Sequence, residues 1–365
     1  MEHIIARRHD EAMTFSLNVL FLQQSYYMKK LAALALVLAM LFSCNNNHIP
    51  DVSNIKVDLT VQRFEKDFFA LDTSNVLNEI QRLKIKYPSF INDYMGKIMG
   101  FDERTSPDSI KKYVPLFIKD YRFVKDSAEK LYPTLDPQVK ELKRGLQFVK
   151  YYYPDYKAPR NLITFIGPFD GYSDVLTSDA FAVGLQLHMG SDFSFYKSDI
   201  SRDIFPEYIS RKFTPEYIPV NCINNIIDDM YPDKTVGKAL IEQMVEKGKR
   251  LFLLDKFLPY TPEYLKIGYT EAQLKDSYAN EAIIWDFFLN NDLLNNTDQN
   301  ITKNYIGESP KTQELGEGSP GNIGAFSGWQ IVKKYMDKNP NTTLPGLMQL
   351  NAREIYNQSK YKPRN

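Results

Sequence analysis

Six polar side chains on two predicted helices have the types and spacing of a cation site. Oxygen ligands from facing helices can hold a divalent cation, because hard cations prefer carboxylate and amide oxygens. Four of the six form two i,i+4 pairs on a helix expected from about residue 215, and two lie on the next helix, expected over 234–257. A solvated helix end accounts for the same residues without a metal, so both interpretations remain open. The six are Asn224, Asn225, Asp228, Asp229, Glu242 and Glu246.

His188 is the single histidine after residue 50, so any Ser-His-Asp or Cys-His arrangement would have to use it. Apolar residues alternate from 181 to 187, which predicts a strand over 180–189 and places His188 on its polar face. We therefore expect an exposed or loop-facing histidine. The sequence contains no CxxC, no HExxH and no GxGxxG directly after a predicted strand. The usual signals of zinc, redox and nucleotide sites are thus absent, and no cofactor is expected.

The N-terminal region ends in a cysteine with a different chemistry. After Met28-Lys29-Lys30, the uncharged run Leu31–Phe42 is long enough for a secretory signal and too short to span a bilayer comfortably. It leads into Leu41-Phe42-Ser43-Cys44, which resembles the lipobox of bacterial lipoproteins. The resemblance implies cleavage before Cys44 and attachment of several acyl chains, such as palmitate, which together anchor a protein firmly to a membrane. A cleaved signal with an incidental cysteine, or an uncleaved anchor, remains the alternative.

The predicted domain boundaries follow from Cys44. Residues 1–27 have mixed charges and fit a signal peptide badly, which suggests a mis-assigned extension before a true start at Met28. Residues 28–43 are then the signal peptide, 44–54 the lipidated cysteine and a polar tether, and 55–365 a single globular domain. Cys222 is left without a disulfide partner, and its apolar, helical setting predicts a buried side chain.

Composition supports a sizeable core. The chain has 365 residues, of which 43% are hydrophobic and 13% aromatic. Lys+Arg and Asp+Glu are equal at 45 each, and this zero net charge argues against nucleic-acid binding, which normally requires a basic excess.

The elements that position these residues are mostly helical. Residues 57–61, 162–167 and 180–189 have the period of strands in one antiparallel or mixed sheet. An apolar stripe that includes Val236 and Leu240 marks the helix over 234–257. The fold class is therefore α+β: a helix-dominated domain with a small mixed β-sheet. Further helix signals are Asp136-Pro137, Thr214-Pro215-Glu216, Thr261-Pro262-Glu263, a capping box at Thr270–Gln273 whose helix should continue through Phe287, Gly324–Tyr335, and Leu347–Ile355.

Seven segments, in order and spacing, resemble one family. They are Leu41–Cys44, Arg63–Phe69, Ile166–Tyr172, Val183–Leu187, Gly248–Asp255, Gly328–Val332 and Ser359–Pro363. Together they are similar to the gliding-motility-associated lipoproteins GldB of Bacteroidetes, over nearly all of 28–365. The resemblance implies an envelope lipoprotein of the gliding apparatus, which is linked to type IX secretion, with protein partners from that machinery and a membrane attachment through Cys44. The tether after Cys44 lacks the acidic run that resembles a surface-export signal, so we expect an outer-membrane anchor facing the periplasm.

The order of sheet, two helices and a late Gly-x-x-x-Gly-Trp helix is also similar to predicted HExxH zinc peptidases. In such peptidases the first helix supplies two histidines and a glutamate base, and the second supplies a glutamate ligand. The matching helix here, Tyr217–Asp229, contains no histidine, although Glu246 can take the place of the third ligand. We hypothesise a degenerate zinc-peptidase scaffold that has lost catalysis and serves in assembly or binding. The alternative is an envelope hydrolase that uses Asp and Glu residues as acid and base.

Overall fold

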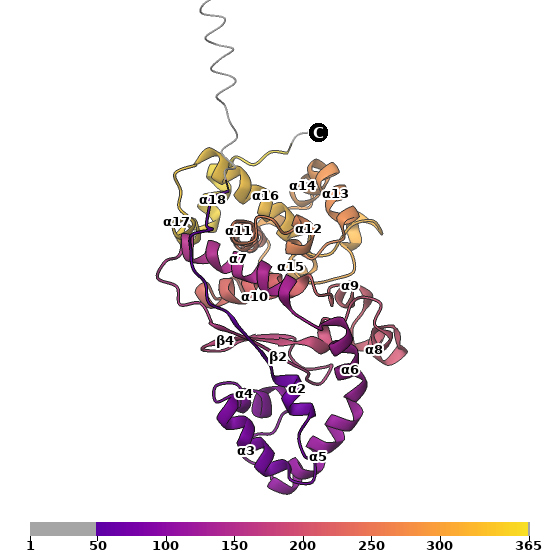
Figure 1. Cartoon of the computed structure of the whole chain (residues 1–365). Coiled ribbons are helices and arrows are strands. Elements are labelled where there is room, and N and C mark those ends of the chain that lie inside the picture. The colour runs from indigo at the N-terminus through magenta and orange to yellow at the C-terminus, as the bar shows by residue number, and fades with distance from the viewer. Residues whose placement is uncertain (1–48, 364–365) are drawn as a thin grey trace, which may run out of the picture. The chain divides into compact units, whose positions relative to one another are not determined.

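The computed structural model describes residues 49–363, and the described chain from Asp51 onward belongs to one compact unit (Figure 1). The predictions for Cys44, for the signal peptide at 28–43 and for the 1–27 extension lie outside the described residues. Val52 is already buried in the core, three residues before the domain start that the sequence suggests. In the described part of the chain, no helix is both long and apolar enough to cross a membrane.

A four-stranded mixed sheet in the order β1-β2-β4-β3 lies at the centre. β1 is parallel to β2, β2 is parallel to β4, and β3 is antiparallel to β4. The α+β prediction is confirmed, with the small mixed sheet. The strands are β1 (Thr60–Arg63), β2 (Asn161–Phe165), β3 (Asp174–Leu176) and β4 (Ala180–Gly184).

The strand predicted over 180–189 is too long. It ends at Gly184, and the chain continues as a short 3-10 turn over Leu185–Leu187. All five residues of β4 are buried, because the strand lies between β2 and β3 and both of its faces are covered. The alternation of apolar residues therefore does not distinguish a buried face of β4 from an exposed one. For the same reason it wrongly predicted that His188, which follows the strand, is exposed.

The first group of helices lies between β1 and β2 in the sequence, and α2 packs on the sheet. Phe64 and Phe68, one turn apart on α2, are fully buried among Phe90, Tyr94 and Phe165. This aromatic cluster fixes α2 on the sheet. The group is α2 (Phe64–Phe69), α3 (Val76–Lys86), α4 (Ile91–Asp93), the π-helical turn η1 (Tyr94–Ile98), α5 (Pro107–Asp120), α6 (Arg122–Leu131) and α7 (Asp136–Tyr152).

The second group of helices fills the C-terminal half. The capping box at Thr270 is confirmed, since its hydroxyl accepts from the Gln273 N–H and the Gln273 side chain accepts from the Thr270 N–H. The helices are α8 (Asp199–Ile204), α9 (Glu207–Ser210), α10 (Tyr217–Met230), α11 (Leu240–Phe257), α12 (Glu263–Ile267), α13 (Glu271–Ala279), α14 (Glu281–Asn290), α15 (Gln299–Ile306), α16 (Ile323–Lys338), α17 (Leu344–Gln349) and α18 (Ala352–Ser359), with 3-10 turns at Ser194–Lys197, Leu293–Asn295 and Gln313–Leu315.

Three predicted helices differ from those observed. The helix expected over 234–257 begins only at Leu240. Gly237 has a φ of 79°, which is incompatible with a right-handed helix, and Val236 before it is 81% exposed. The helix that opens at Thr270 stops at Asn280, whose backbone leaves the helical region, and α14 starts anew. The final helix is two helices, separated by the extended residue Leu350.

Helices cover both faces of the sheet (Figure 1). α2 contacts β2 from one side, whereas α10 contacts β3 from the other and packs on α7 and α11. α11 in turn packs along α16, which contacts α18. The buried side chains form one continuous core from Val52 to Ile355.

The α11–α16 contact depends on two glycines, and we call it the glycine crossing (Gly248, Lys249 and Gly328 with their contacts). A Cβ atom on Gly328 would overlap the main-chain oxygen of Met244, and one on Gly248 would overlap that of Gly328. The two backbones therefore touch directly, without side chains between them. Lys249, 1% exposed, donates to Glu246 Oε1 at 3.0 Å and to the Leu350 carbonyl at 2.6 Å, so it joins α11 to the end of α17.

Candidate functional site

The polar residues proposed for a cation site are held apart by separate partners. Arg250 binds Asp228, the Tyr156 hydroxyl donates to Asp229 at 2.9 Å, and Lys249 donates to Glu246. Asn224 and Asn225 are half-buried on the same helix, α10. Within residues 49–363, no three His, Cys, Asp or Glu side chains come together in a group that could hold a metal. Each carboxylate is thus part of a local ion pair or hydrogen bond.

The prediction of an exposed His188 is wrong. Its side chain is 1% exposed, because the chain turns inward after Gly184 instead of continuing as a strand. Nε2 lies 3.0 Å from Asp174 Oδ2, and Nδ1 lies 3.2 Å from the Thr214 carbonyl oxygen. Asn221 of α10 donates to the same Asp174 oxygen at 2.7 Å. His188, Asp174 and Asn221 form a buried polar cluster between the sheet and α10.

Burial opposes protonation of this imidazole, but Asp174 outweighs it. The charge of Asp174, with the hydrogen bonds that the imidazole donates to Asp174 and to the Thr214 carbonyl, raises the pKa of His188 above its usual value. The neighbouring Cys222 is buried as predicted, and burial raises the pKa of its thiol well above the usual range. A thiol of this kind is a poor nucleophile, because the thiolate is the reactive form.

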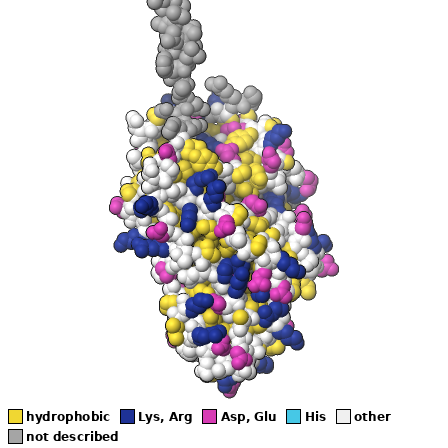
Figure 2. Space-filling model, viewed as in Figure 1, with side chains coloured by type: hydrophobic (Ala, Val, Ile, Leu, Met, Phe, Trp, Pro, Cys, Tyr) yellow, Lys and Arg dark blue, Asp and Glu magenta, His cyan; other side chains and the backbone are white. Residues whose placement is uncertain are grey.

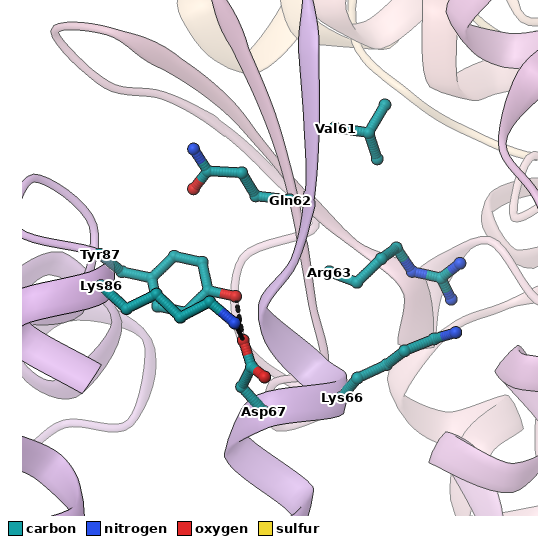
Figure 3. Close-up of a pocket in the computed structure, with 7 residues that line it drawn as sticks. All are labelled: Val61, Gln62, Arg63, Lys66, Asp67, Lys86 and Tyr87. Carbon is teal, nitrogen blue, oxygen red and sulfur yellow. Dashed lines mark hydrogen bonds and ion pairs between the residues drawn. The ribbon is translucent and has the colours of Figure 1, made fainter. Parts of the chain in front are cut away.

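A surface hollow of about 390 Å³ lies beside β1 and the start of α2, and we call it the β1–α2 groove (Figure 3). Three of its seven lining residues come from the segment Arg63–Phe69, where the sequence indicated a family resemblance but no binding site. The spacing of that segment accounts for part of the groove: its aromatic residues and Glu65 are buried, whereas Lys66 and Asp67 lie on the outer side of α2. The lining residues are Val61, Gln62, Arg63, Lys66, Asp67, Lys86 and Tyr87.

Arg63 is held in place from beneath the groove. Its Nε donates at 2.5 Å to Glu65, a buried carboxylate that also accepts from the Thr164 hydroxyl at 2.6 Å. Its Nη1 donates to the main-chain oxygen of Tyr132 at 2.9 Å, and its buried Nη2 has no hydrogen-bond partner in the described part of the chain. Burial raises the pKa of Glu65 despite the opposing charge of Arg63. The guanidinium is therefore fixed in orientation and retains an unused donor.

The opposite end of the groove contains a compact network around Asp67. Lys86 donates to Asp67 Oδ2 at 2.5 Å, and the Tyr87 hydroxyl donates to the same oxygen. Burial disfavours the charged form of Asp67, but these two hydrogen bonds outweigh it and lower the pKa of its carboxyl. Asp67 is thus ionised and already bound.

Positive charge predominates in the groove. Arg63, Lys66 and Lys86 line it with a single carboxylate, Asp67. Lys66 is exposed and forms no ion pair within residues 49–363. On the face seen in Figure 2, acidic and basic side chains alternate over most of the surface, in keeping with the zero net charge. The excess of cations in the groove is therefore local.

The fold and the groove define a helix-dominated α+β protein with a cationic hollow beside one sheet edge and its single described histidine buried. Comparison with protein families identifies the family to which the chain belongs. The chain belongs to the family of the gliding motility protein GldB, whose sequence model matches residues 45–363, nearly the whole chain. The predicted family resemblance is confirmed, and six of the seven segments lie within the matched residues. No curated protein and no solved structure matches this chain, and the expected likeness to zinc peptidases is not supported.

Proposed function

We propose that this protein is a non-catalytic component of the gliding apparatus, linked to type IX secretion, that binds a protein partner through the β1–α2 groove. Membership of a gliding-motility lipoprotein family supports the role in motility. The observation that supports binding is the fixed Arg63 guanidinium beside the exposed and unpaired Lys66. Such pre-positioned charge favours recognition, because little order is lost when a partner docks.

Hydrolysis by acidic residues has less support from the same geometry. It requires two carboxylates of suitable protonation near one substrate atom. Among the seven lining residues Asp67 is the one carboxylate, and Lys86 and Tyr87 already bind it. Stoichiometric zinc in the purified protein, or a peptidase activity that Glu246→Ala abolishes, would contradict the non-catalytic role.

We also propose a lipid anchor at Cys44 in the outer membrane, with the domain facing the periplasm. Membership of a lipoprotein family supports the anchor. Labelled palmitate should be incorporated into the wild-type chain and not into Cys44→Ala, which should move from the membrane to the soluble fraction. Equal membrane association of both proteins would argue against lipidation.

Binding can be tested by photo-crosslinking in intact cells. A photoreactive amino acid at position 61, which lines the groove and is 37% exposed, should give an adduct with an identified envelope protein that gliding also requires. The matched control is position 283 on α14, since Ile283 is 63% exposed and far from the groove lining in sequence. Adducts of equal yield at both positions, no adduct at either, or normal gliding after deletion of the protein would contradict the proposal.

A further inference from the structure

β1 has one open edge. Within the described residues it pairs with β2 alone, and the Thr60 N–H donates to the Arg160 carbonyl at 2.8 Å. In a parallel ladder alternate residues bond to the same neighbour, so Thr60 and Gln62 face β2. The main-chain N–H and C=O of Val61 therefore point away from the sheet, where they are free to pair with another strand.

The open edge passes directly along the β1–α2 groove. Val61, Gln62 and Arg63 of β1 all line the hollow, and the side chain of Val61 is 37% exposed. Figure 3 shows Arg63 and Lys66 on one side of β1, and Lys86 with Tyr87 on the other side. Unpaired main-chain groups and two sets of side chains are thus available in one place.

Charge on the two sides of β1 differs. On the first side, Arg63 is fixed by Glu65, and the exposed Lys66 forms no ion pair within residues 49–363. On the second side, Lys86 is already neutralised by Asp67. Side chains of an added strand alternate between the two sides. Every second residue of that strand would lie near Arg63 and Lys66, and an acidic residue there would pair with Lys66.

We infer that the groove binds an extended acidic segment of a partner protein, which adds to the sheet as a strand beside β1. This inference rests on the proposed function and names the chemistry of the partner. Main-chain hydrogen bonds to Val61 supply affinity, and carboxylates at alternate positions supply selectivity through Arg63 and Lys66. β1 has four residues, so the bound segment is short.

An open, basic edge can also serve two purposes that need no acidic partner. Lysines on a short edge strand prevent unwanted pairing between molecules. A second copy of the chain is another possible occupant of the edge. In both cases acidic peptides should bind no better than neutral ones.

The test uses the full-length lipidated protein in detergent and synthetic eight-residue peptides with blocked termini. One peptide alternates aspartate with valine, and the control alternates serine with valine. We expect the aspartate peptide to bind and the serine peptide to bind at least about tenfold more weakly, with an affinity that falls as salt rises.

Variants at Val61 isolate the main-chain contribution. Val61→Pro removes the outward N–H without removing a bond to β2, and proline is tolerated on the open side of an edge strand. It should weaken binding of the aspartate peptide about tenfold, the effect of one lost hydrogen bond. Val61→Ala retains the N–H and is the matched control, which should bind like the wild type. Lys66→Glu should weaken binding about tenfold through charge alone.

The results distinguish this inference from the proposed function. Equal binding of both peptides, or equal binding by Val61→Pro and Val61→Ala, overturns strand addition. Equal binding of flexible polyglutamate or of vesicles containing phosphatidylglycerol also overturns it, in favour of a general anion site. Dimers in sedimentation that Val61→Pro abolishes would make a second copy the occupant. If position 61 still crosslinks to an envelope protein in any of these cases, the proposed function stands without the inference.

Discussion

The β1–α2 groove and the glycine crossing contain segments of similar character, yet they treat their charges in opposite ways. Both segments mix lysine, arginine and acidic residues with phenylalanine or leucine. In the glycine crossing, Lys249 is buried and bonded to Glu246 and to the Leu350 carbonyl. In the groove, Lys66 is exposed and has no ionic partner within residues 49–363. A charge satisfied inside the fold stabilises the architecture, whereas an unpaired charge at the surface is suited to recognition.

The largest expected effect tests whether the glycine crossing is as tight as described. Gly328→Ala should lower the free energy of unfolding by more than about 3 kcal/mol, because the methyl group meets a main-chain oxygen that cannot move aside easily. Chemical denaturation measures the loss. Gly318→Ala is the control, since a Cβ there meets no atom within 4 Å, and its change should stay below about 0.5 kcal/mol. Similar stabilities for the two variants would show that the helices do not touch.

The second effect tests the buried ammonium. Lys249→Met should cost about 3 kcal/mol, because it leaves Glu246 and two carbonyl oxygens without their donor. The exposed Lys334 on α16 forms no ion pair in the described residues and provides the matched control. Lys334→Met should change the unfolding free energy by less than about 0.5 kcal/mol. A gain in stability from Lys249→Met would mean that apolar packing outweighs the ion pair there.

The third effect extends the comparison to the buried polar cluster. The pKa of His188 is raised above 6.5 in the folded state, so its bond with Asp174 stabilises the fold fully below pH 6.5. That contribution is lost as pH rises through the folded-state pKa. His188→Gln should lower stability by about 1 to 2 kcal/mol at pH 6 and should remove this part of the decline at alkaline pH. Thermal unfolding from pH 6 to 9 gives the two profiles, and parallel profiles would exclude a protonated His188.

The smallest effect on stability is expected in the groove. Lys66→Glu should change the unfolding free energy by less than about 0.5 kcal/mol, because the side chain is exposed and unpaired. The same variant should lose the partner adduct formed from position 61, in contrast to Lys334→Met. A large loss of stability in Lys66→Glu would show that Lys66, like Lys249, stabilises the fold. The two regions would then not differ in how their charges are used.

Local signals in the sequence predicted local structure well. The capping box at Thr270 and the helix after Gly324 depend on residues within a few positions of each other, and both were confirmed. Helix boundaries that depend on single backbone conformations, at Gly237 and Asn280, were missed. Apolar periodicity continues across such residues, so it cannot show where the chain turns.

The groove and the buried polar cluster depend on contacts between distant parts of the chain. Glu65 is fixed by Thr164, 99 residues away, and His188 is fixed by Asp174 and Asn221 from different elements. The alternation of apolar residues also gave a wrong prediction for His188, because the preceding strand β4 is buried on both faces. The charged residues of Arg63–Phe69 were visible in the sequence. The sequence did not show that Arg63 pairs with Glu65 and that Asp67 pairs with Lys86, so that Lys66 has no ion pair.

Tyr132 connects the two sites that differ most in exposure. Its main-chain oxygen accepts from Arg63 in the groove, and its hydroxyl donates to the His188 carbonyl oxygen. His188 is the one histidine after residue 50, so selective isotope labelling gives a single imidazole resonance from the folded domain. A ligand that moves Arg63 should shift that resonance through Tyr132, which makes the buried imidazole an intrinsic NMR reporter of groove occupancy.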